Sequence, residues 1–326
     1  MSLDADLIVD RRRMRRKLTF WRVTTVLVAI AAVVVAAVAV TKRDALTGGP
    51  GGSIARVTIE GLIRSNRQRV EALERLSSSN AKAVIIHVNS PGGTVAGSEQ
   101  LHDALMRLKA KKPVVVVVDG LAASGGYIAA MASDRIYAQE SSLVGSIGVI
   151  FQYPNVSELL KTVGVKVEAV RSSPLKAAPS GYEPTSPEAT AAIEAIVGDT
   201  YSWFRDLVKN RRSLDQPLLE RVTDGRVFTG RQALELKLID ALGNEQSAIE
   251  WLSKERNIDP KTPVRDYRLS PRIGDLSFLR IAAIGAFEAV GLADIARRLE
   301  QSGALQAIER LNLDGLLALW HPPSSN

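Results

Sequence analysis

PVVVVVDGLAASGGYIAA, residues 113–130, is the stretch that determines the predicted fold. Five consecutive valines between a proline and a glycine-rich turn are typical of a strand that is buried on both faces of a sheet. The apolar run that begins near Ser124 predicts a helix over residues 124–133. A buried strand, a tight turn and a helix in this order are the building unit of a parallel α/β sheet.

The same alternation extends along the chain in both directions. Further strands are predicted at 54–59, 83–88, 135–138 and 165–170, and further helices at 65–77, 96–110 and 187–211. The last helix begins with Ser186-Pro187-Glu188, a cap followed by proline in the first turn. We therefore expect an α/β domain over residues 54–258, with mostly parallel strands and crossover helices.

The amino-terminal part of the chain predicts a membrane anchor. Residues 23–40, VTTVLVAIAAVVVAAVAV, carry no charge and as a helix would nearly match a bilayer core. A basic leader at 1–22 precedes them, which places the amino terminus in the cytoplasm and the rest outside. A cleaved signal peptide is the alternative, but eighteen apolar residues exceed the usual length. Residues 41–53 form a glycine-rich linker.

Composition excludes several classes of function. The net charge is +7, but +5 of it lies in residues 1–50, so the remainder has no basic face for nucleic acid. The chain has no cysteine, which excludes disulfides and a cysteine nucleophile. Its three histidines lack metal-ligand spacing, and no nucleotide-binding glycine motif is present. We expect neither a metal nor another cofactor.

The remaining residues, 259–326, are predicted to form a C-terminal helical tail of unknown role. Within it, residues 276–296 are apolar but interrupted by charges, which indicates an amphipathic helix rather than a second membrane span. Such a helix packs against a partner chain or lies on a membrane surface.

Two glycine-rich turns follow predicted strands, at residues 89–93 (NSPGG) and 120–127 (GLAASGGY). Open α/β sheets place their sites at the carboxyl ends of strands. Ser124 would stand at a helix start, where free backbone N–H groups and the helix dipole favour a developing oxyanion. Acyl transfer needs such a serine. The alternative is that Ser124 is only a helix N-cap.

A nucleophilic serine also needs a base. His87 falls inside a predicted buried strand, His102 on a predicted helix surface beside Asp103, and His321 in the tail, so all three are poor candidates. A lysine can act as a base only when burial keeps its amine neutral. Lys176 lies in SSPLKAAPS, a small and otherwise uncharged neighbourhood. The alternative is that it is a solvated loop lysine.

A set of motifs resembles the bacterial signal peptide peptidase A proteases, which are related in fold to Clp protease and the crotonases. The resemblance covers residues 54–258 and implies a fold of repeated ββα units, preceded here by the predicted transmembrane helix. The motifs are NSPGG (89–93), GLAASGGYIAA (120–130), VGSIGVI (144–150), SSPLKAAP (172–179) and DGRVFTGRQALELKLID (224–240).

The resemblance implies a role for five residues. Ser124 corresponds to the nucleophile and Lys176 to the general base. Ser146 corresponds to a serine that holds the lysine amine in place. The backbone N–H groups of Gly93 and Gly125 correspond to the oxyanion hole.

The resemblance also implies partners and a location. The expected protein is a membrane-anchored endopeptidase that degrades remnant signal peptides and other exposed hydrophobic segments. It would form a homo-oligomeric ring in which each site is shared between subunits. It would sit in the bacterial cytoplasmic membrane as a single-pass protein, with its catalytic domain on the periplasmic side. The alternatives are a crotonase-like acyl-CoA enzyme and a catalytically idle membrane scaffold.

Overall fold

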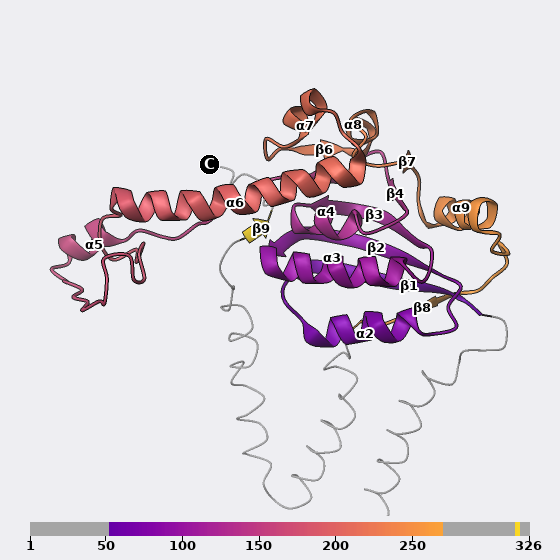
Figure 1. Ribbon diagram of the computed structural model, residues 1–326, viewed down its shortest axis with the longest axis horizontal. Helices are drawn as coiled ribbons and strands as arrows, with labels where there is room; N and C mark the ends of the chain where they lie inside the picture. Colours follow the sequence, from indigo (N-terminus) through magenta and orange to yellow (C-terminus); the bar gives the residue numbers. More distant parts are fainter. Residues whose placement is uncertain (1–51, 270–316, 320–326) are drawn as a thin grey trace, which may run out of the picture. The chain divides into compact units, whose positions relative to one another are not determined.

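The computed structural model describes residues 52–269 and 317–319, which contain a single mixed sheet and its covering helices (Figure 1). The strands are β1 (Ile54–Ile63), β2 (Ala83–Thr94), β3 (Val114–Ala123), β4 (Arg135–Ala138), β5 (Leu143–Gly145), β6 (Val227–Thr229), β7 (Ala241–Leu242), β8 (Val264–Asp266) and β9 (Leu317–Leu319). The helices are α2 (Arg67–Ser77), α3 (Val95–Lys109), α4 (Gly125–Ala130), α5 (Ser157–Thr162), α6 (Pro187–Arg212), α7 (Gln216–Val222), α8 (Gly230–Glu235) and α9 (Glu245–Arg256).

The sheet is mostly parallel, as the alternation of strands and helices predicts. Its main path runs β6-β5-β3-β2-β1-β8, and only the β5–β6 and β2–β9 pairs are antiparallel. The long strand β3 has two partners on one side, because its first half pairs with β4 and its end pairs with β5. The predicted fold class and parallel pairing are therefore confirmed for the described residues.

Both faces of the central strands are buried. Alternate residues of β2 enter different cores: Val84 and Ile86 pack in the cluster that includes α2, α3 and α4, whereas Ala83 and Ile85 pack against α9. A strand covered by helices on both sides needs apolar side chains at every position, which explains the unbroken valine run of β3. The central strands are thereby rigid supports for the turns at their carboxyl ends.

Two predictions for secondary structure are wrong. Residues 165–170 form no strand: Val165, Val167 and Val170 are exposed, and the segment pairs with no described strand. Their alternation of apolar and charged residues fits a half-buried strand, but a strand needs a neighbour to pair with. Within the predicted helical tail, residues 264–266 and 317–319 form the strands β8 and β9, because they pair with β1 and with the end of β2.

The predicted anchor at 23–40 and the predicted helix at 276–296 lie outside the described residues. Among the described helices, none combines the length and the apolar composition that crossing a bilayer requires.

Tyr127 attaches α4 to the segment that follows α8. Its side chain is fully buried, and its hydroxyl donates a hydrogen bond of 2.7 Å to the carbonyl oxygen of Leu238. Burial raises the pKa of this phenol, so it stays a neutral donor. We expect Tyr127→Phe to lower the free energy of unfolding by about 1–3 kcal/mol, since it leaves a carbonyl group without its partner.

Urea denaturation of the two proteins measures this difference. Tyr153→Phe is the matched control, because the Tyr153 hydroxyl forms its hydrogen bond, at 2.7 Å, with the Thr185 hydroxyl in a partly exposed position, where water can replace it. Equal stability of Tyr127→Phe and the wild type would contradict the prediction.

Candidate active site

Ser124 stands where β3 ends and α4 begins, in a backbone conformation that non-glycine residues rarely adopt. Its φ is 54° and its ψ is −117°. Such a conformation costs roughly 1–3 kcal/mol and persists only where the surroundings hold it. Here the Ser124 N–H donates a 2.7 Å hydrogen bond to the Gly145 carbonyl oxygen, and the residue is 1% exposed. The turn therefore fixes the Ser124 side chain in one place.

The Ser124 hydroxyl makes no structural hydrogen bond to the described residues. Ser124 occupies the N-cap position of α4, but its side chain makes no cap hydrogen bond. Its buried Oγ has no hydrogen-bond partner in the part of the chain that the structure describes. The alternative that Ser124 serves only as an N-cap is therefore wrong. A buried polar atom without a partner costs free energy, so its retention calls for an explanation in function.

Ser124 directly precedes the first turn of α4. Gly125 is the first residue of the helix, where N–H groups have no intrahelical acceptor. The role in the oxyanion hole that the family resemblance implies for Gly125 stays a prediction.

The second glycine-rich turn lies at the end of β2. Gly93 pairs in register with Ile63 of β1, and a Cβ at Gly93 would lie 1.8 Å from the Ile63 carbonyl oxygen. Only glycine fits there. Strand β9 pairs antiparallel with the end of β2, where Ala318 lies opposite Gly93 and Leu319 lies opposite Gly92. The edge at Gly93 therefore accepts an extended polypeptide.

Ser146 lies beside Ser124 at the end of the neighbouring strand. The last paired residues of β3 and β5 are Ala123 and Gly145, and each is followed directly by one of the two serines. Ser146 is buried, has a φ of 51°, and donates its N–H to the Arg226 carbonyl oxygen at 2.8 Å. The sheet register thus brings Ser124 and Ser146 together. Sequence reasoning assigned no role to Arg226, and its backbone contact has no signature in the sequence.

Lys176 lies apart from these residues. It is exposed, in the loop between α5 and α6. Figure 1 shows this loop beside α5, at the end of α6 remote from α4. The predicted dry neighbourhood of Lys176 is therefore not formed by the described residues of one chain, and the loop that carries Lys176 lies away from α4.

The histidines do not replace this base. The two ring nitrogens of His87 lie 2.9 Å from Asp119 and 2.7 Å from Glu245, so His87 joins β2 to β3 and α9. His102 is buried, which corrects the prediction that it lies on the helix surface, and burial lowers its pKa. No group of three acidic or histidine side chains in the described ranges is placed to hold a metal ion.

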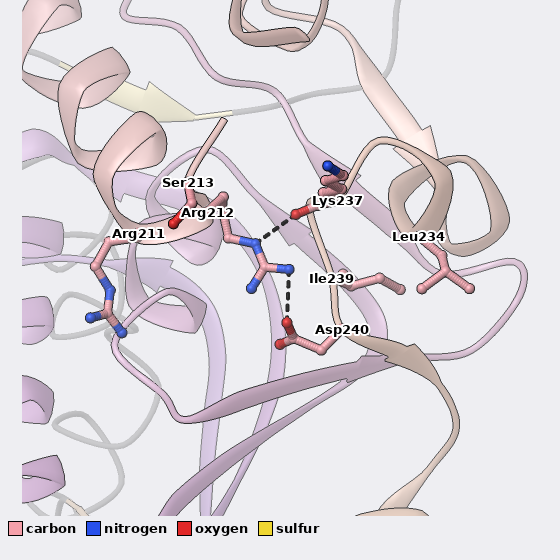
Figure 2. Close-up of a pocket in the computed structure, with 7 residues that line it drawn as sticks. All are labelled: Arg211, Arg212, Ser213, Leu234, Lys237, Ile239 and Asp240. Atoms are coloured by element: carbon pink, nitrogen blue, oxygen red, sulfur yellow. Dashed lines mark hydrogen bonds and ion pairs between the residues drawn. The ribbon is translucent and has the colours of Figure 1, made fainter. Parts of the chain in front are cut away.

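An open cavity of about 460 Å³ lies elsewhere, between the end of α6 and the segment after α8 (Figure 2). Arg212 donates to the Lys237 carbonyl oxygen at 2.7 Å and pairs with Asp240 at 2.9 Å. The other carboxylate oxygen of Asp240 accepts the Ile136 N–H. These contacts fasten the segment after α8 to the sheet, and no residue of the two glycine-rich turns lines this cavity.

Comparison with known proteins gives matches over most of the domain. The family model described as peptidase family S49 matches residues 106–259, and the Clp protease family model matches residues 61–144. The second match confirms the predicted Clp protease-like fold. Among solved structures, a ClpP1 variant of Listeria monocytogenes is 18% identical, with a TM-score of 0.39, over 58% of this chain and 91% of that chain.

Curated relatives carry protease names. A candidate protease of Synechocystis sp. is 35% identical over 64% of this chain and 76% of its own. A candidate signal peptide peptidase SppA of Enterococcus faecium is 30% identical over 72% of both chains. Protease 4 of Haemophilus influenzae is 30% identical over 58% of this chain and 31% of its own.

Proposed function

The chain belongs to peptidase family S49 and is a serine peptidase of the signal peptide peptidase A type, and from this premise we propose that Ser124 is its nucleophile. The observation that carries the proposal is the buried Oγ of Ser124, which has no partner in the described part of the chain and is held by a strained turn at a helix start. Attack of this oxygen on a peptide carbonyl carbon gives a tetrahedral intermediate. The N–H groups of Gly93 and Gly125 stabilise its oxyanion.

Lys176 is the proposed general base. As a neutral amine it takes the Ser124 proton, passes a proton to the leaving amine, and then activates the water that hydrolyses the acyl-enzyme. The Ser146 hydroxyl, next to Ser124, accepts a hydrogen bond from this amine and positions it. Since Lys176 is exposed and remote within one chain, the amine must be buried by something else.

A second copy of the chain is the proposed source of that burial. Of the large apolar side chains exposed in the described ranges, most belong to one segment, residues 150–196, which includes the Lys176 loop. They are Ile150, Leu159, Val163, Val165, Val167, Val170, Leu175, Tyr182 and Ile196. Exposed apolar surface of this kind is typical of an interface between proteins. In a ring of such copies, this segment covers Ser124 of the neighbouring chain, so that Lys176 is buried and lies beside the nucleophile.

The proposed substrates are extended hydrophobic peptides, remnant signal peptides among them. Antiparallel pairing of β9 with Gly92–Thr94 supports this, because an edge that pairs with one extended segment can pair with a substrate strand that takes the place of β9. Leu62 is exposed and pairs with Gly92 at this edge, where it offers an apolar contact. We place the domain on the periplasmic side of the bacterial cytoplasmic membrane, anchored by residues 23–40, where cleaved signal peptides are released.

A fluorophosphonate probe tests the proposal, because it modifies only a serine that is activated as a nucleophile. We expect the purified full chain to bind one probe per chain at Ser124, located by mass spectrometry of the digested protein. Heat-denatured protein is the control. A folded protein that acquires no label, or acquires it at another serine, would contradict the proposal and favour an idle scaffold.

A further inference from the structure

Ser90 lies at the point where three strands depart from regular pairing. The β1–β2 register shifts between Glu60 and Leu62, and the β2–β3 register shifts between Val88 and Ser90. Such shifts leave backbone N–H and C=O groups without ladder partners. In a buried region these groups must be satisfied in another way.

The Ser90 hydroxyl satisfies two of them at once. It donates a 2.7 Å hydrogen bond to the carbonyl oxygen of Gly61, the residue at the shift in β1, and accepts a 3.1 Å hydrogen bond from the Gly92 N–H. Ser90 is 0% exposed, so water cannot substitute for either bond. One side chain therefore connects β1 to the glycine-rich turn at the end of β2.

The bond to Gly92 controls the orientation of the proposed oxyanion donor. Gly92 has a φ of 109°, and a glycine in such a conformation has no side chain to limit its rotation. The next N–H along the chain is that of Gly93. The Gly92 N–H belongs to the peptide group before Gly92, and Ser90 holds this group. The Ser90 Oγ also lies 3.5 Å from the Gly92 carbonyl oxygen, which belongs to the same peptide group as the Gly93 N–H, so one hydroxyl contacts the peptide groups on both sides of Gly92.

Ser90 also touches the turn that carries the nucleophile. A Cβ at Gly126 would lie 2.6 Å from the Ser90 carbonyl oxygen and 3.2 Å from its Cβ, so α4 packs directly on Ser90. Gly126 is two residues from Ser124. Ser90 thus contacts the turn at Gly92 through its hydroxyl and the turn that carries Ser124 through its backbone.

We propose that Ser90 is a positioning residue, whose hydroxyl aligns the Gly93 N–H with the carbonyl group attacked by Ser124. This inference rests on the proposed function of the same site. It assigns Ser90 no contact with substrate. Its effect is therefore on the transition state, in which the oxyanion exists, and not on the binding of a peptide in its ground state.

The test compares Ser90→Ala with Ser142→Ala. Ser142 is a matched control, because it is also buried, accepts the Gln139 N–H at 3.2 Å and donates to the Val118 carbonyl oxygen at 3.0 Å, with the Asp119 carbonyl oxygen at 3.3 Å. Its hydroxyl thus contacts the end of the regular part of β3, and within the described part of the chain it makes no hydrogen bond to the turn at Gly92 and Gly93. Removing a whole oxyanion donor typically costs 10²- to 10³-fold in kcat. Because Ser90→Ala displaces the donor without removing it, we expect about a 10-fold lower kcat, with KM within about twofold.

Two inhibitors give a second readout. A peptide aldehyde adds the Ser124 oxygen to its carbonyl carbon and places the new oxyanion or hydroxyl in the oxyanion hole, whereas the corresponding peptide alcohol cannot. Ser90→Ala should bind the aldehyde about 10-fold more weakly and the alcohol equally well, and Ser142→Ala should change neither affinity.

Equal kinetics and equal aldehyde affinity of the two variants would overturn the inference. If Ser90→Ala does not fold, Ser90→Thr decides, because it restores the hydroxyl and should keep kcat within about threefold of the wild type. A larger loss in Ser90→Thr would also overturn it. Failure of the wild type to label at Ser124 would instead refute the proposed function.

Discussion

Ser124→Ala is expected to lower kcat for peptide cleavage by about 10³-fold or more and to abolish fluorophosphonate labelling. The reason is that Oγ is the atom that forms the acyl-enzyme, and among the fully buried hydroxyls of the described residues only that of Ser124 lacks a hydrogen-bond partner. Because Oγ makes no hydrogen bond in the described structure, its removal also deletes no stabilising contact. The variant should therefore melt at or above the temperature of the wild type.

Ser133→Ala is the control for this experiment. Ser133 is buried just beyond α4, and its hydroxyl donates to the Ala130 carbonyl oxygen at 2.7 Å, so its loss affects stability without touching the proposed chemistry. Its kcat should stay close to that of the wild type. An activity of Ser124→Ala above about one tenth of the wild type would exclude Ser124 as the nucleophile.

Lys176→Ala is expected to be as inactive as Ser124→Ala, and a mixture of the two inactive proteins is expected to regain activity. If each site takes Ser124 from one chain and Lys176 from its neighbour, random assembly of an equal mixture makes about one site in four complete. The measurement is the steady-state rate after the chains are mixed, dissociated and reassembled. Recovery of about a quarter of the wild-type rate is the expected result.

Lys161→Ala is the control for the lysine. Lys161 is exposed in the same segment and pairs with Glu158 at 2.8 Å on the surface of α5. Its loss should leave the rate unchanged, since exposed ion pairs contribute little. Complete absence of activity in the reassembled mixture would contradict a site shared between subunits, and full activity of Lys176→Ala alone would contradict its role as the base.

Some features of Ser124 could be predicted from the sequence and others could not. Its place between a valine strand and an apolar helix could be predicted, because buried strands and glycine-rich turns have local signatures. Its φ of 54° and its unpaired hydroxyl could not, because they depend on which groups the fold brings to Ser124, such as the Gly145 carbonyl oxygen that accepts its N–H. Only that geometry shows that the Ser124 side chain makes no N-cap hydrogen bond.

The errors have a common cause in contacts that are distant in sequence. The pattern at 165–170 fits a strand, but it lies in the segment whose apolar side chains have no partner within the described chain. His102 has a charged neighbour in sequence, yet its face of α3 is covered by the fold. Local patterns report which face of an element is apolar, and they do not report what covers it.

The sequence by itself determined the parallel α/β sheet, the two glycine-rich turns at strand ends and the candidate residues within them, because hydrophobic period and turn chemistry are local properties. Only the tertiary structure decided that Ser124 and Ser146 follow paired strand ends, that β9 occupies the edge at Gly93, and that the loop between α5 and α6 lies at the end of α6 remote from α4. Strand register and the position of a loop depend on packing between distant segments, which no local pattern encodes.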